Sequence, residues 1–317
     1  MTAPDQSKQP PEGSDAQPRS AKKFDLLAMQ AEIGALLQKQ IFFLGGTAKS
    51  GTTWLQVLLD AHPHVSCTGE NHLVNVLSPG VQKTLEEYNR IVLDPRGNTA
   101  FQLGKAPTLF DSDDFSYVFA SAMLALLLKQ AKAKPAALAI GDKTPQNVRL
   151  FGLLTRLIPG SKCIHIVRDP RDAAVSGWHH IRRLYPEQAS SRFPTQYEYA
   201  KHYAEVWEFE VARGVRFGKR SDRYIEARYE DLSERPAATL KRLFGFLGVE
   251  HDDALVERCF REASFEKLTG GRARGDERRD SFFRKGVVGD WKTGLSPESL
   301  DVLVAKCGDL MRHFGYL

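Results

Sequence analysis

Short apolar runs alternate along the chain with longer stretches in which apolar residues recur at helical spacing. Ile41 to Leu44 is continuously apolar, as is typical of a strand buried on both faces of a sheet, and Cys163 to Val167 also reads as a strand. Ala137 to Ile140 and Tyr224 to Arg228 are further strand candidates. Because strands separated by helices form parallel sheets, the pattern predicts an α/β fold with three layers, in which helices flank a central parallel sheet.

Helical segments follow most of these strands. The sequence predicts helices near 26–37, 53–61, 148–157, 170–185, 196–217, 236–247, 252–262 and 297–314. Residues 78–115 lack clear periodicity and contain three prolines, so we expect a lid, the wall of a binding site or a surface excursion there. Residues 1–23 are polar and proline-rich, which predicts a disordered tail, with a single domain over 24–317.

The segment GGTAKSGTTW follows the first apolar run. In the common phosphate-binding loop, G-x-x-x-x-G-K-[ST], the lysine follows the second glycine, whereas here Lys49 precedes it. Backbone N–H groups at the start of a helix point outward with partial positive charge, and a glycine turn lets them surround an anion. The order of strand, turn and helix therefore predicts a P-loop-like anion site. Its residues are Lys49, Ser50, Gly51, Thr52, Thr53 and Trp54.

Composition narrows the possible partners. The 44 basic and 39 acidic residues give a net charge of +5, which fits an anionic ligand, and we expect no nucleic-acid partner. The four cysteines are widely spaced without a CxxC motif, so we expect reduced core thiols and no metal site. The most apolar stretch, Met123 to Leu128, is too short to span a membrane, and no signal segment is visible. We therefore expect a cytoplasmic protein.

Two further segments place cations where a sheet edge is predicted. In HIVRDPRDAAVSGWHH, Arg168 stands at the end of a strand, where open α/β sheets bind ligands. In FFRKGVVGDWK, Arg284 and Lys285 precede Gly286, and such a segment can wrap around an anion. Taken alone, an arginine capped by neighbouring aspartates or a solvated basic loop would account for each segment as well.

Taken together in this order, the motifs resemble those of the sulfotransferases that use 3′-phosphoadenosine-5′-phosphosulfate (PAPS). AKSGTTW looks like their phosphosulfate-binding loop, and the segments around Arg168 and Arg284 look like those that bind the 3′-phosphate. The likeness covers roughly Phe42 to Lys292, with gaps. It implies in-line transfer of a sulfuryl group to a hydroxyl or amine, with adenosine 3′,5′-bisphosphate (PAP) as product. The implied donor contacts beyond the loop are Arg168, Ser176, Arg284, Lys285 and Gly286 at the phosphate, and Tyr229, Phe265 and Trp54 at the base.

Such a transfer needs a base for the acceptor's proton and cations for the transferring group and the leaving phosphate. Lys49 is the candidate for the leaving phosphate, and Lys143, in GDKTPQN, resembles the family's second active-site lysine. Cytosolic members have a histidine two positions later, where this chain has Pro145. The segment with Glu70 instead resembles tyrosylprotein and bacterial sulfotransferases, which implies a glutamate base. His72 is the rival candidate for the base.

Two other functions share some of these features. A P-loop NTPase or small-molecule kinase would have the same fold and loop, with Asp142 as the nearest magnesium ligand, but no lysine follows Gly51. A non-catalytic polyanion-binding module would use the basic cluster from Arg272 to Arg284.

The acceptor is expected to be a small phenol or alcohol, while a sugar or a peptide tyrosine remains possible. Four aromatic residues either line its pocket or form the core of a helix: Phe193, Tyr197, Tyr203 and Trp207. The sequence leaves the oligomeric state open, since no C-terminal dimer motif is recognisable.

Overall fold

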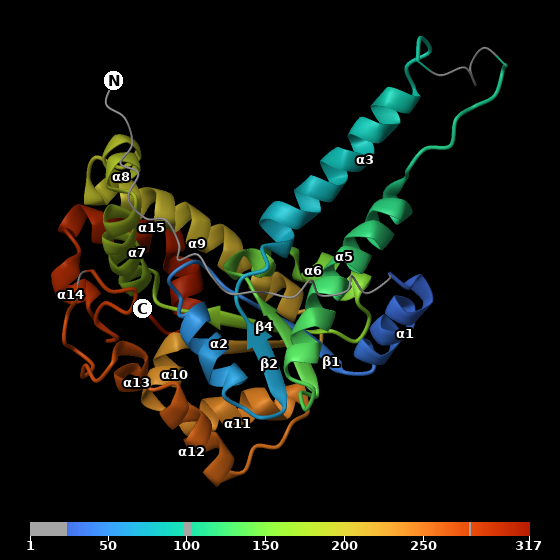
Figure 1. Cartoon of the computed structure of the whole chain (residues 1–317). Helices are drawn as coiled ribbons and strands as arrows, with labels where there is room; N and C mark the ends of the chain where they lie inside the picture. The colour runs from blue at the N-terminus through green and yellow to red at the C-terminus, as the bar shows by residue number, and fades with distance from the viewer. Residues whose placement is uncertain (1–23, 98–102, 279) are drawn as a thin grey trace, which may run out of the picture.

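A central parallel sheet organises the chain (Figure 1). The computed structural model describes residues 24–97, 103–278 and 280–317, so the predicted tail, 1–23, lies outside the described residues. The strand order is β2-β3-β1-β4-β5, and every pairing is parallel. Helices lie on both faces, which confirms the predicted three-layer α/β fold. The strands are β1 (Gln40–Gly45), β2 (Val65–Thr68), β3 (Ala139–Lys143), β4 (Lys162–Val167) and β5 (Tyr224–Arg228).

The predicted helices are present close to their predicted bounds. A 22-residue helix, Ser112–Ala133, was missed, although its buried residues Phe119, Met123 and Leu127 recur at helical spacing. Among the described helices, none combines the length and apolar character that crossing a bilayer requires. The α-helices are α1 (Leu26–Leu36), α2 (Thr52–Asp60), α3 (Ser78–Val92), α5 (Ser112–Ala133), α6 (Phe151–Leu157), α7 (Pro170–Leu184), α8 (Pro186–Arg192), α9 (Gln196–Gly218), α10 (Tyr229–Glu234), α11 (Pro236–Leu247), α12 (Asp253–Glu262), α13 (Phe265–Thr269), α14 (Trp291–Gly294) and α15 (Pro297–His313), with a π-helical turn η1 (Leu73–Leu77) and a 3₁₀ segment η2 (Pro145–Leu150).

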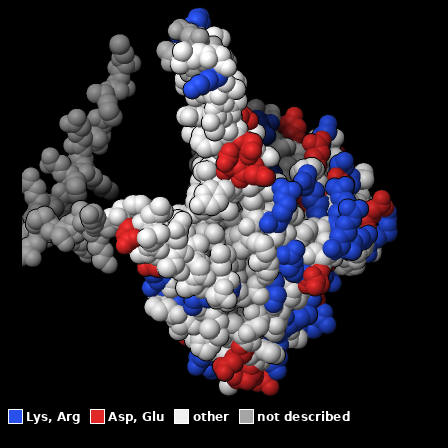
Figure 2. Space-filling view, turned by 90° about the vertical axis from the view of Figure 1, so that its right-hand side faces the viewer, with Lys and Arg blue, Asp and Glu red and all other residues white. Residues whose placement is uncertain are grey.

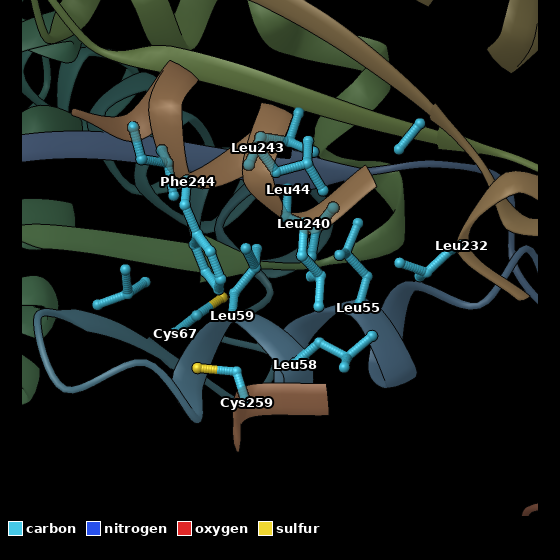
Figure 3. Packing of buried hydrophobic residues seen from close by; sticks show 14 of the residues in the cluster. Leu44, Leu55, Leu58, Leu59, Cys67, Leu232, Leu240, Leu243, Phe244 and Cys259 are labelled. Atoms are coloured by element: carbon cyan, nitrogen blue, oxygen red, sulfur yellow. The ribbon is translucent and has the colours of Figure 1, made fainter. Parts of the chain in front are cut away.

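Strand β1 lies at the centre of the sheet, and its side chains alternate between two hydrophobic clusters. Phe42 and Leu44 pack with α2, α11 and α12, where leucines from α2 and α11 interdigitate (Figure 3). Ile41 and Phe43 pack on the opposite face with α5 and α6. Because successive side chains of a strand point to opposite faces, a strand covered on both sides must be apolar throughout. This arrangement explains the uninterrupted run from Ile41 to Leu44.

The prediction for residues 78–115 was wrong in part. Val81, Leu85, Tyr88 and Val92 do recur at helical spacing, and they lie on α3. Pro79 stands in the first turn of α3, where its missing N–H leaves no bond unmade. Helix α3 and the first part of α5 project from the body as an arm, whereas the rest of α5 packs on the sheet (Figure 1). The short strand β2 was also missed, since four residues are too few for a periodic signal.

Basic residues are not spread evenly over the surface. In the view of Figure 2, Lys and Arg side chains gather along one side of the body, while the arm carries few charges. The four cysteines are buried and free, as the sequence predicts. All five strands run in one direction, so their carboxyl ends share one edge of the sheet, and Gly45, Lys143 and Val167 end their strands there.

Gly51 provides a test of this architecture. It has a φ of +91°, and a Cβ there would lie 2.5 Å from the Tyr229 ring. We expect Gly51→Ala to lower the free energy of unfolding by about 1–3 kcal/mol, through backbone strain and overpacking. Gly34→Ala is the matched control, because Gly34 lies within α1 with open space around it. Urea denaturation of both variants measures the difference, and equal stabilities would contradict the expectation.

Candidate active site

A cavity of about 320 Å³ opens at the carboxyl edge of the sheet. Its wall combines the loop after β1, the start of α7 and the segment before α14, which lie far apart in the sequence. Ser50 and Lys143 are predicted site residues that lie behind this wall, both buried. The predicted residues on the wall are Lys49, Gly51, Thr52, Thr53, Trp54, Glu70, Arg168, Ser176, Tyr229, Phe265, Arg284, Lys285 and Gly286.

The loop after β1 presents the start of α2 to this cavity. The helix begins at Thr52, Gly51 is its N-cap, and no side chain caps it. The first N–H groups of α2 therefore have no side-chain acceptor and carry the partial positive charge of a helix start. Behind them, the Ser50 hydroxyl is buried without a hydrogen-bond partner within the described chain. The loop is thus built to receive an anion.

Lys49 lines the same cavity, where neighbouring positive charges repel its ammonium group. Burial, followed by repulsion from the nearby cations Arg168 and Arg183, lowers its pKa to about 8, against the opposing effect of Glu70. The ammonium group lies 4.8 Å from the centre of the Phe282 ring, a cation–π distance. A bound anion would relieve the repulsion between Lys49 and the two arginines.

Arg168 joins the two cationic segments. It follows the end of β4, and its guanidinium donates to the carbonyl oxygens of Lys49, at 3.3 Å, and Val287, at 3.1 Å. The same group lies 4.1 Å from the centre of the Tyr229 ring. Its Nε is buried and has no partner among the described residues. One side chain therefore holds the loop and the C-terminal segment against each other.

The C-terminal cations have carboxylate partners. Arg284 donates to Glu277, at 2.6 Å, and pairs with Asp290, while Lys285 donates to Asp290 at 2.6 Å. Burial of Asp290 opposes its ionisation, but the hydrogen bonds from Lys285 and Arg284 outweigh this effect and lower its pKa. An arriving anion would have to share or replace these carboxylates.

Two backbone contacts shape the same segment. The N–H groups of Gly289 and Trp291 donate to Asp172, at 2.7 and 2.9 Å, which ties the segment to α7. Gly286 has a φ of +68°, and a Cβ there would lie 2.6 Å from the Phe265 ring. The backbone can therefore cover Phe265 only because residue 286 is a glycine.

Three aromatic residues form an apolar wall beside the cations. Trp54, Tyr229 and Phe265 are each at least 93% buried yet present an edge to the cavity. Trp54 donates from Nε1 to the carbonyl of Ala263 and meets Tyr229 edge-on at 5.5 Å between ring centres. Arg274 lies over the Trp54 ring at 4.8 Å. A wall of this kind is suited to the flat face of a nucleobase.

Glu70 and Lys143 form an ion pair at the cavity. The Lys143 ammonium donates to Glu70 Oε1 at 2.7 Å and lies 3.3 Å from the Thr53 hydroxyl. The Lys143 side chain is 3% exposed, whereas that of Glu70 is 35% exposed. The rival base, His72, places Nε2 3.9 Å from Glu70 Oε2 and is not on the cavity wall.

Asp142, the nearest candidate for the magnesium ligand of a kinase, does not line the cavity. Its carboxylate accepts hydrogen bonds from the side chains of Asn71, at 2.8 Å, and Asn147, at 2.7 Å. It is fully buried and is not on the cavity wall. The amide donors occupy both carboxylate oxygens.

Comparison with known proteins decides the family. The sequence model of the sulfotransferase family matches residues 41–253. This chain belongs to the sulfotransferase family. Cytosolic sulfotransferase 16 of Arabidopsis thaliana is 28% identical over 169 residues, which are 46% of this chain and 50% of that protein. Human sulfotransferase 1C2 is 27% identical over 157 residues, 44% of this chain and 53% of that protein.

This family member thus spans about half the length of these two curated relatives. A putative protein-tyrosine sulfotransferase of Caenorhabditis briggsae is 25% identical over 219 residues, 69% of each chain. The crystal structure of mouse sulfotransferase SULT7A1 complexed with PAP has a TM-score of 0.52 at 20% identity, covering 92% of this chain and 96% of that one. The structural likeness shows a shared fold.

The aromatic residues considered for the acceptor pocket are not on the cavity wall. Phe193, Tyr203 and Trp207 are buried in a cluster between α7, α9 and α15, and Tyr197 is exposed. Two of them support the site from behind. Tyr203 donates from its hydroxyl to the Ala48 carbonyl at 2.6 Å, and Trp207 donates from Nε1 to the Arg168 carbonyl at 3.0 Å. In this family member, α9 therefore positions the loop after β1 and the backbone of Arg168.

Sequence reasoning missed several wall residues. His180 lies on α7, four positions after Ser176, so helical spacing alone would have placed it on the same face. Arg274 and Phe282 belong to the segment before α14, where no periodicity predicts which side chains face inward. Pro145 stands on the wall where cytosolic members of the family, by the sequence resemblance, have histidine.

Because the pKa of Lys49 is lowered, we expect that replacing this lysine stabilises the fold, by an amount that depends on pH. Folding disfavours the charged form, so Lys49 destabilises the fold below about pH 8, and this cost disappears as the pH rises toward 10.5. Lys49→Met should therefore raise the free energy of unfolding at pH 7, with a smaller gain at pH 10. Urea denaturation at the two pH values tests this. Lys83→Met, on the exposed side of α3, is the control, and a pH-independent difference would contradict the prediction.

Proposed function

We propose that this chain transfers a sulfuryl group from PAPS to a hydroxyl or amine of an acceptor, releasing PAP. The proposal rests on one observation. Arg168 joins two cationic segments, the loop with Lys49 and the C-terminal segment with Arg284, around one cavity. An adenosine donor with two separate anionic groups needs two such cradles, one for the phosphosulfate and one for the 3′-phosphate of the ribose. Family membership and the PAP complexed with the mouse sulfotransferase support the same assignment.

The residues present fit this donor. Among the buried polar side-chain atoms that have no hydrogen-bond partner within the described chain, three belong to the two cradles: Ser50 Oγ, Arg168 Nε and Arg284 Nε. Buried polar groups in native proteins are nearly always paired, so an anionic ligand would satisfy them. In the proposed complex the loop and Lys49 hold the phosphosulfate. Arg168, Ser176 and the segment from Arg284 to Gly286 hold the ribose phosphate, and Trp54, Tyr229 and Phe265 surround the adenine.

The donor supplies an activated sulfuryl group whose bond to the 5′-phosphate breaks as the acceptor oxygen or nitrogen bonds to sulfur. We propose that Glu70 removes the acceptor's proton and that Lys49 neutralises the leaving phosphate. Lys143, now paired with Glu70, lies where it could turn toward the sulfuryl group. Such a turn would leave Glu70 Oε1 open to the acceptor's proton. The position of Glu70 on the cavity wall supports it over His72.

The proposed acceptor is a small phenol or alcohol. The wall beside the cations includes the apolar side chains of Ala48, Pro145, Phe282 and Phe283. Apolar walls with a few placed polar groups are typical of small-molecule sites. We further propose that 24–317 acts as one domain, because its hydrophobic clusters share a single sheet, and that it works in the cytoplasm, like the relatives named cytosolic.

Donor preference gives the direct test. We expect PAP to raise the midpoint of thermal unfolding by several degrees more than adenosine 5′-monophosphate, because only PAP occupies both cradles. ATP with magnesium should have a smaller effect, since the residue after Gly51 is a threonine. Incubation with PAPS and a panel of phenols and alcohols, read by the mass of the products, then identifies the acceptor. Preference for ATP would overturn the proposal in favour of a kinase.

The base is tested by a pair of substitutions. Glu70→Gln should lower turnover at least about 100-fold, the usual worth of a general base, while PAP binding measured by calorimetry stays within a factor of about three. His72→Gln is the matched control, because its ring neighbours Glu70 outside the cavity wall. If His72→Gln lost the activity and Glu70→Gln kept it, the roles would be reversed.

A further inference from the structure

His180 occupies a place in the cavity that the sulfuryl transfer does not use. It lies on α7 one turn beyond Ser176 and faces the same cavity. Both residues also line a small adjoining hollow of about 10 Å³, together with Lys49, Arg183 and Arg284. The Phe282 ring meets the His180 ring edge-on at 6.0 Å. His180 is therefore half-buried within a group of cations.

The charges around His180 come from three directions. Lys49 faces it from the loop, Arg183 from its own helix, and Arg284 from the C-terminal segment, and the titratable ring of His179 lines the same hollow. Three carboxylates of the C-terminal segment already have cationic partners. Asp280 pairs with Arg278, Glu277 with Arg284, and Asp290 with Arg284 and Lys285. Glu70 lies on the wall of the main cavity, paired with Lys143.

The ring of His180 is neutral in this setting. Burial, followed by repulsion from Lys49 and Arg183, lowers its pKa to about 4. Arg183 Nη2 lies 3.4 Å from His180 Nδ1, and because arginine can only donate, this contact leaves the ring proton on Nε2. A second proton on Nδ1 would place a third cation beside Lys49 and Arg183, unless an anion lay among them.

We propose that His180 is a further ligand of the donor's ribose phosphate and that it takes up a proton when this phosphate binds. The inference rests on the proposed function, which places the phosphate at Ser176 and Arg284. A phosphate monoester carries a charge of about −1.5 to −2 at pH 7, which replaces repulsion around the ring by attraction. Residues four apart on a helix lie one above the other, so Ser176 and His180 can contact one anion together.

The proton balance follows from the contacts. Arg183 leaves His180 Nδ1 and turns its donor to the phosphate, and a proton from solvent binds Nδ1. In the free protein the ring is neutral above about pH 4, whereas in the complex it keeps its proton up to a higher pH. Between these two pH values the complex holds one proton more than the free protein. Affinity for donor and product therefore falls as the pH rises through that range, so higher pH favours release of PAP.

Calorimetric titration tests the proton uptake. Binding of PAP is measured at pH 6.5 in two buffers of different ionisation enthalpy, for the wild-type chain and for His180→Gln. The ligand's own phosphate titrates in both proteins, so the difference in proton count belongs to His180. We expect the wild type to take up more protons, by as much as one, and the variant to bind PAP roughly tenfold more weakly, the worth of one charge-assisted hydrogen bond.

Two controls isolate the effect of the 3′-phosphate on the ribose. Adenosine 5′-monophosphate, which lacks the 3′-phosphate, should give the same proton count in both proteins. His202→Gln removes a half-buried histidine of α9 outside the cavity and should behave as the wild type does with PAP. Equal proton counts for the wild type and His180→Gln with PAP would overturn the inference while leaving sulfuryl transfer intact. Failure of the wild-type chain to bind PAP would overturn the proposed function as well.

A second measurement does not depend on the variant's folding. Histidine-selective ¹⁵N NMR of the wild-type chain reports the protonation of each imidazole directly. One ring should change from neutral to protonated on addition of PAP at pH 6.5 and not on addition of adenosine 5′-monophosphate. If no imidazole changes its protonation with PAP bound, His180 has no such role.

Discussion

The Arg168 guanidinium is the contact on which the geometry of the whole site depends. It holds the carbonyl of Lys49 on one side and that of Val287 on the other, and it stacks on Tyr229. These three groups come from the loop after β1, the C-terminal segment and the start of α10, which directly follows β5. A planar group with several donors in fixed directions can bind all three at once, which a lysine could not do. The parallel sheet makes this possible, because it places the ends of β1, β4 and β5 at one edge.

Helix α9 supports this contact from behind. Tyr203 and Trp207 lie one turn apart, and each donates to a backbone carbonyl, one in the loop and one at Arg168 itself. Both side chains are almost fully buried, so their positions are set by packing against α7 and α15. The distance between the two cradles is therefore fixed by a rigid helix rather than by the loops that touch the ligand. Sites supported in this way keep the geometry that a transfer reaction requires.

The sequence predicted the elements that neighbouring residues form and missed the contacts between residues far apart along the chain. The strand, turn and helix around Gly51 are consecutive along the chain, from Gln40 to Asp60, so their pattern could be read directly, and four of the five strands were found in this way. The contact of Tyr203 with Ala48 joins residues 155 positions apart, and nothing in the local pattern separates this tyrosine from one that lines a pocket. Motif resemblance placed Arg168 and Arg284 at one site, and the structure places both on one cavity wall. It did not reveal that Arg284 already has carboxylate partners.

The placement of the lysine before the second glycine has a physical consequence. Residue 49 adopts a left-handed backbone, with a φ of +71°, which is costly for a non-glycine residue. Its carbonyl accepts from Arg168, and its ammonium lies among like charges with a lowered pKa. Strain and repulsion at one residue persist only where the surrounding structure enforces them, and here Arg168 and α9 do so. The free protein therefore holds a concentration of positive charge that only an anion can balance, so binding energy is available before any contact with the acceptor is made.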